Sequence, residues 1–183
     1  MSGDPSNANL WEDANVLIAF DPDAANIPAD VDEAFDNTWT LVGLLDGDQG
    51  FTTARSEDVT EKYAWGRRLI KTSRRNFKET KSFTAYEYND AVQALLYPGS
   101  DPITAGTRDL KVPTVQRVMI AFETIENDVV RRMISFYEAE VALNGDLNEN
   151  ESDVTGYPFI ATIYPGGDDV DILWIEQITE VGS

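Results

Sequence analysis

Three observations predict a mainly β (α+β) fold, in which two packed antiparallel sheets form a β-sandwich or barrel beside one short α-helix. Many short runs of β-branched and aromatic residues end at turn-forming residues. Tyr137, Ala139 and Val141 alternate with Glu138 and Glu140, which is typical of a strand with one solvated face. Only one segment has helical spacing. With 183 residues, the chain is expected to form a single domain, 1–183, with a substantial core.

The predicted strands are bounded by turn signals. Asp21-Pro22-Asp23 follows the first strand, and Pro165-Gly166-Gly167 follows the seventh. Glu126-Asn127-Asp128 is a short polar turn that suits a hairpin. In chain order, strands are expected at residues 16–20, 38–45, 64–71, 74–88, 115–125, 129–143, 159–164 and 170–178.

One segment predicts a helix, over residues 90–97. Asn89 is a suitable N-cap, and Asp90 favours the positive end of the helix. Pro98-Gly99 ends the helix. The apolar residues that recur at helical spacing, and that should cover a sheet edge or the core, are Ala91, Val92, Leu95 and Leu96.

Polar segments with little periodicity predict long loops at residues 5–15, 21–37, 46–61 and 144–156. A compact domain seldom contains so much irregular chain unless its loops have a function.

The net charge of −19 and the pI of about 4.1 disfavour binding to nucleic acid or to an anionic membrane surface. No apolar run is long enough to span a bilayer. The amino terminus lacks the basic and apolar regions of a secretory signal. We therefore expect a soluble protein that is made in a cytoplasm and has no membrane partner.

The charges are segregated along the chain. Residues 1–54 and 133–183 each carry 11 acids and no base, whereas residues 55–132 carry 11 acids and all 14 bases. Eight of these bases lie between Lys62 and Lys81. They form either a solvated basic face, with weak ion pairs, or a surface through which one copy meets an acidic arm of another.

The absence of His and Cys excludes disulfides, Cys–His and Ser–His–Asp catalysis, and ordinary zinc, copper or haem sites. Two runs resemble calcium loops, but neither has the sharp-turn Gly at its sixth position, so acidic turns are the favoured interpretation. These runs contain Asp46, Asp48 and Glu57, and Asn144, Asp146, Asn148 and Asn150. A third acidic turn contains Asp168, Asp169 and Asp171.

Phosphate-binding glycine loops are absent, and no spacing selects a carboxylate pair for glycosidase chemistry. We therefore predict no enzyme, and no catalytic, metal-ligating or cofactor-binding residues. Trp39, Trp65 and Trp174 are expected to pack in the core or on a sheet. Trp11 lies in a polar segment, where it is an anchor onto either its own body or a neighbouring subunit.

Several blocks together resemble the major tail protein, or tail-tube protein, of long-tailed phages, particularly those that infect actinobacteria. They span nearly the whole chain, but they contain no catalytic signature. The blocks are TWTLVGLLDGDQGF (38–51), SEDVTEKYAWG (56–66), TSRRNFKETKSFTAYEYNDAVQALLYPGS (72–100), IAFET (120–124), YEAEV (137–141) and NENESDVTGYPFIATIYP (148–165).

The resemblance implies a virion protein whose copies close into rings, usually hexamers, which stack into a tail tube. It implies an amino-terminal arm at 1–15 and an inter-ring loop at 46–63. Other tail proteins (tape measure, terminator and distal tail protein) would be partners. The tube would be assembled in the bacterial cytoplasm, and double-stranded DNA would pass through its lumen unbound.

The charge agrees with that expectation, because a carboxylate-lined lumen keeps phosphates off the wall. We expect acids to line the lumen, the bases from Lys62 to Lys81 to lie at subunit interfaces, and residues 46–63 to become ordered on assembly. The predicted interface residues are Trp11, Asp46, Asp48, Phe51, Arg55, Glu57, Asp58, Lys62, Arg67, Arg68, Arg74 and Arg75.

Other functions remain open. A tail terminator or head–tail connector would form single rings. A domain adapted to high salt would depend on that salt, and a glycan-binding module or glycosidase would bind glycans as a monomer.

Overall fold

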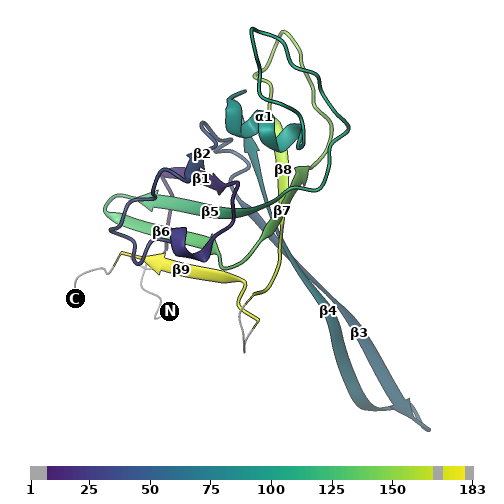
Figure 1. Ribbon diagram of the computed structural model, residues 1–183. Helices are drawn as coiled ribbons and strands as arrows, with labels where there is room; N and C mark the ends of the chain where they lie inside the picture. The colour runs from purple at the N-terminus through teal and green to yellow at the C-terminus, as the bar shows by residue number, and fades with distance from the viewer. Residues whose placement is uncertain (1–7, 167–170, 180–183) are drawn as a thin grey trace.

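The computed structural model describes residues 8–166 and 171–179, and it confirms a mainly antiparallel β fold with one α-helix (Figure 1). The strands form two sheets that share one long strand, β5 (Arg117–Glu126). The start of β5 pairs with β7 at Arg117 and Val118, whereas residues 121–126 pair with β6. Because β5 belongs to both sheets, the two layers of this sandwich-like architecture are joined along that strand.

The first sheet has the order β2 (Trp39–Leu41), β1 (Asp13–Ala19), β5, β6 (Val129–Ser135) and β9 (Trp174–Ile178). The second has the order β5, β7 (Ala139–Leu143), β8 (Tyr157–Ile163), β4 (Arg68–Ala85) and β3 (Thr52–Ala64).

The main core lies between the two sheets. Phe122 from β5 is fully buried and contacts Phe83 from β4, with ring centroids 5.8 Å apart. Phe159 from β8 packs on Phe83 at 5.4 Å. Burial of each such side chain stabilises the fold by about 1.5–3 kcal/mol.

The predicted helix is confirmed as α1 (Asp90–Leu96), which covers one end of this core with the predicted apolar residues. The Asn89 side chain accepts a hydrogen bond from the Val92 N–H (3.0 Å), as expected for an N-cap. Its amide also donates to the Val42 carbonyl (2.7 Å), so the cap fixes the helix to the segment after β2.

The segment between β1 and β2 is irregular, as predicted, apart from the short 3-10 helix η2 (Ala24–Asn26). It covers the outer face of the first sheet, where Trp39 and Met119 are buried in a second cluster. The Trp39 indole donates to the Asn26 carbonyl (2.8 Å), and Arg132 donates to the Glu33 carbonyl (2.7 Å). This loop therefore functions as a packed layer of the fold.

The most prominent feature is the β3–β4 hairpin, which extends far from the body (Figure 1). Residues 79–85 of β4 pair with β8, whereas residues 68–78 pair with no strand except β3 in the part of the chain that the structure describes. We call residues 56–78, the part of the hairpin without a third strand, the ribbon. At about 3.3 Å per residue, its β4 side reaches about 36 Å.

The ribbon contradicts two predictions. Residues 52–64 form β3, not the loop expected at 46–61 or 46–63, and the strand expected at 64–71 contains the hairpin turn. Gly66 (φ 83°) and Arg67 (φ 65°) form that turn. β3 has no buried face, so its sequence lacks the alternation that marks a half-buried strand.

Other boundaries also differ. Residues 13–15 of the predicted amino-terminal arm belong to β1, because they pair with β5. The strand expected at 38–45 is confined to β2, and the strand expected at 129–143 is divided into β6 and β7. The hairpin at 126–128 is confirmed, with Asn127 at φ 50° in its turn. The predicted strand 170–178 is β9, and residue 170 lies outside the described residues.

Candidate assembly surface

The ribbon exposes large apolar side chains around its turn. Trp65 is fully exposed, which contradicts the expectation that it packs in the core or on a sheet. Tyr63, Leu69 and Ile70 are also exposed near it. These four residues define the ribbon tip. Clustered exposed apolar residues of this kind often mark a contact with another molecule.

The ribbon is also basic. It carries seven bases and three acids, a net charge of +4, so the rest of the chain carries −23. Arg74 pairs with Glu57 (3.0 Å), and Asp58 accepts a hydrogen bond from Asn76 (2.8 Å). Within the described ranges, no carboxylate lies within 4 Å of the other six cations, which are Lys62, Arg67, Arg68, Lys71, Arg75 and Lys78.

Seven of the predicted interface residues lie together on the ribbon: Glu57, Asp58, Lys62, Arg67, Arg68, Arg74 and Arg75. Phe51 and Arg55 lie at its base. The structure therefore brings most of this set onto one projecting element, although it does so through a β-hairpin and not through the predicted loop.

Asp46 differs from the rest of the predicted set because it is buried within its own turn. Its carboxylate accepts hydrogen bonds from the backbone N–H groups of Asp48 (2.9 Å) and Gln49 (3.2 Å). A hydrogen bond to Asp46 also raises the pKa of the Tyr86 hydroxyl. Asp46 thus stabilises the turn that leads into β3.

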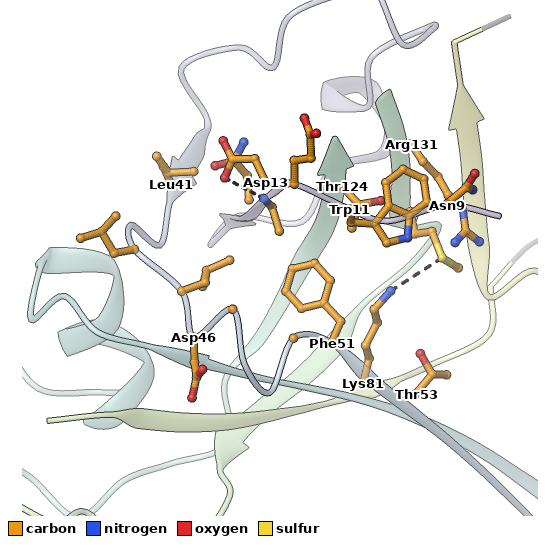
Figure 2. A pocket seen from close by; sticks show the side chains of 18 of the residues that line it. Asn9, Trp11, Asp13, Leu41, Asp46, Phe51, Thr53, Lys81, Thr124 and Arg131 are labelled. Carbon is orange, nitrogen blue, oxygen red and sulfur yellow. Dashed lines mark hydrogen bonds between the residues drawn. The ribbon is translucent and has the colours of Figure 1, made fainter. Parts of the chain in front are cut away.

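A groove of about 1200 Å³ lies at the base of the hairpin (Figure 2). Its walls come from the amino-terminal segment, the turn after β2, the first residues of β3, and parts of β4, β5 and β6. Trp11 is half-buried in this groove, so it packs against the body of its own chain. Of its two predicted roles, the structure favours the anchor onto its own body.

Lys81 lies at the floor of this groove and points from β4 towards Met133 (Figure 2). The side chain is only 7% exposed. Its Nζ lies 4.5 Å from the ring centroid of Phe122, 5.4 Å from that of Phe51 and 5.6 Å from that of Trp174. Desolvation by this apolar surrounding, and then the charge of Arg131, lower the pKa of Lys81 to about 8.

Glu79 precedes Lys81 on the same side of β4 and is almost completely buried. Its carboxylate accepts hydrogen bonds from Arg55 Nε (2.5 Å) and from the Trp174 indole (2.5 Å). These contacts connect β3, β4 and β9, and so fix the base of the ribbon to the body.

The sequence analysis did not select Glu79 or Lys81 as buried groups. A signal was present, because residues 79, 81, 83 and 85 share one face of β4 and Phe83 is an obvious core residue. This parity predicts that the two charged side chains point inward. Lys81 was instead grouped with the bases that begin at Lys62.

The candidate calcium runs do not converge. In the parts of the chain that the structure describes, no three carboxylates are grouped as metal ligands. Asn150 instead accepts a hydrogen bond from the Ser152 N–H (2.9 Å) in an exposed turn. Asp168 and Asp169 lie outside the described residues. Over those same ranges, no helix is long and apolar enough to cross a bilayer.

Comparisons with known protein families and with curated proteins found no match for this chain.

Proposed function

We propose that this chain is a structural protein that assembles with copies of itself into stacked rings, as in the tail tube of a long-tailed phage. The observation that carries the proposal is the ribbon, which is long, basic and tipped with apolar side chains, and which pairs with no further strand among residues 8–166 and 171–179.

A two-stranded hairpin is at best marginally stable alone in water, and three or more strands or a covering layer are normally needed. The ribbon has neither over residues 56–78. Contact with another molecule would bury Trp65 and its neighbours and supply the missing layer. The exposed apolar tip therefore favours a protein whose working state is an assembly.

The ribbon carries +4 and the rest of the chain −23, so the most complementary surface available is the body of another copy. Complementary charge steers association and sets its register. It also disfavours contact between two ribbons, which repel each other. A contact from ribbon to body is heterologous, and such contacts generate rings or open stacks.

Among the described residues β3 pairs only with β4, so its other edge presents unpaired backbone N–H and C=O groups along 13 residues. A strand or loop of a neighbouring copy can pair with this edge. Repeated around a ring, such pairing would line a channel with sheet. Acidic side chains from the body would then give a lumen that repels DNA phosphates.

In this proposal the assembly, and not a catalytic site, is the function. The copies would form rings, expected to be hexameric, that conduct double-stranded DNA without binding it. The other tail proteins would bind at the two ends of the tube in the virion.

Negative-stain microscopy and light scattering across a concentration series test this function. Long hollow tubes of uniform width are expected, and their formation should depend on the ribbon tip. Single rings would instead indicate a terminator or connector. A chain that stays monomeric at all concentrations, with the ribbon intact, would contradict the proposal. Glycan binding by that monomer would favour the binding-module alternative.

A further inference from the structure

The groove at the base of the hairpin is acidic. Its lining contains five carboxylates and three cations. Arg55 is paired with Glu79 (2.5 Å), and Arg131 is paired with Glu176 (2.6 Å). The third cation, Lys81, is enclosed by its own chain and only 7% exposed. Across residues 8–166 and 171–179, no cation lies within 4 Å of the other four carboxylates, which are Glu12, Asp13, Asp46 and Glu87.

Apolar side chains surround these carboxylates. Leu10, Leu41 and Leu44 line the groove and are exposed, and Trp11 and Phe51 are half-buried in it (Figure 2). Its volume of about 1200 Å³ exceeds the roughly 300–1,000 Å³ of ordinary small-molecule pockets. An exposed apolar surface rimmed by polar groups is typical of a contact with another protein. The groove therefore suits a protein element that is both apolar and basic.

The ribbon tip has the matching composition. Its side chains are apolar and exposed, and residues 62–71 around it carry four bases and no acid. In the described part of the chain, no carboxylate lies within 4 Å of those bases. Trp, Tyr and Arg are the residues that most often anchor a protein–protein contact in a pocket of the partner. Residues 62–71 contain all three types.

We propose that the ribbon tip of one copy binds in the groove of a second copy, with Trp65 between the apolar walls and the bases of the tip facing the carboxylates. This inference rests on the proposed self-assembly, and it identifies the surface of the body that receives the ribbon. Burial of Trp65 would supply affinity, and the complementary charges would set the register of the contact.

The contact joins different surfaces of the two copies. The length of the ribbon, about 36 Å, separates the tip from the groove, so a copy cannot fill its own groove (Figure 1). Two copies that exchanged tips reciprocally would lay their ribbons side by side, and two ribbons with a net charge of +4 each would repel. The contact therefore continues from copy to copy, which generates rings or open stacks.

Photochemical cross-linking of the full chain tests the inference. The sequence contains no Cys, so a single Ala64→Cys substitution places a benzophenone maleimide beside Trp65 and keeps the apolar side chains of the tip. These chains are mixed with copies that carry a heavy nitrogen isotope, allowed to associate and irradiated. Mass spectrometry then distinguishes links between copies from links within one copy.

We expect most links between copies to reach residues 9–15 and 41–51, which line the groove. Val112→Cys with the same label is the control, because Val112 is highly exposed but lies outside the ribbon. Its links to those residues should be at least tenfold fewer.

A reversal of charge tests the complementarity. Arg67→Glu with Arg68→Glu in the tip should lower linking to the groove at least tenfold, because like charges would then face each other. Glu12→Lys with Asp13→Lys in the receiving copy should restore it, and both of these side chains are exposed. Lys111→Glu reverses a charge outside the ribbon and should leave linking unchanged.

Links that fall mainly outside the groove would overturn the proposal, as would a failure of the doubly reversed pair to recover. It would also fail if a fluorescent DNA duplex bound the wild type saturably and abolished the links. The ribbon would then be an arm that binds nucleic acid.

The outcomes for the groove and for the tube are separable. Tubes whose tips link to another surface would refute the groove contact and leave the proposed function intact. Links to the groove in a chain that forms only small closed oligomers would support the groove contact and contradict the tube.

Discussion

The Trp65→Ser substitution separates assembly from folding. Trp65 is fully exposed in the isolated chain, so its replacement should change the free energy of unfolding by no more than about 0.5 kcal/mol. In an assembly, a Trp side chain can bury about 200 Å². At about 25 cal/mol/Å², half of that burial contributes about 2.5 kcal/mol to each contact. We therefore expect the critical concentration for assembly to rise roughly 50- to 100-fold.

Light scattering against protein concentration measures this shift, and urea denaturation of the dilute protein measures the stability. Val112→Ser is the control, because Val112 is also a highly exposed apolar residue but lies far along the chain from the ribbon. It should leave the critical concentration unchanged. An unaltered critical concentration in Trp65→Ser would refute the role of the tip. A loss of several kcal/mol in monomer stability would show that Trp65 packs against its own chain.

Three further predictions concern charge and the core. Assembly should weaken between 0.1 and 1 M salt, because the Debye screening length falls from about 10 Å to about 3 Å. Light scattering that does not change over this range would exclude charge pairing between the ribbon and the body of another copy. Phe122→Ala should lower the free energy of unfolding, measured in urea, by about 3–5 kcal/mol, because Phe122 contacts Phe51, Phe83 and Trp174. A loss below about 1 kcal/mol would contradict the packing of this core. Lys81→Met should stabilise the chain at pH 7. Because folding lowers the pKa of Lys81 from 10.5 to about 8, the wild type is destabilised by about 3 kcal/mol below pH 8 and regains that stability between pH 8 and 10.5. The groups that face the amine are Glu79 on β4, Arg131 on β6 and Glu176 on β9. The difference in the free energy of unfolding between wild type and Lys81→Met, measured by urea denaturation, should therefore disappear between pH 8 and 10.5. A difference that stays constant over this range would refute the buried charge.

The parts of the fold that were predictable from the sequence are those where one residue type has one structural use. Asn89 before an apolar stripe predicted α1 to within a residue, because an N-cap side chain satisfies a specific backbone N–H. Asn127 marked the turn between β5 and β6 because Asn tolerates positive φ. Both signals are local, so tertiary contacts did not change them.

The ribbon could not be predicted in this way. Hydrophobic periodicity reports which face of a strand is buried, and β3 has no buried face along residues 52–63. Only the pairing register with β4 makes it a strand, and that pairing is set by a turn at Gly66 that the sequence analysis placed inside a strand. The groove was not predicted either, because Lys81 lies at its floor. Charged side chains are normally exposed, so the sequence analysis did not place Lys81 on the buried face of β4 beside Phe83.

The continuity of β4 has a mechanical consequence. The strand runs from the exposed tip at Arg68 to the core at Ala85, where seven successive residues pair with β8. A pull along the ribbon therefore acts on all seven of those pairs in shear, at the same time, and does not peel them apart one by one. If copies are joined through their ribbons, tension on the assembly is therefore borne by the buried sheet of each copy.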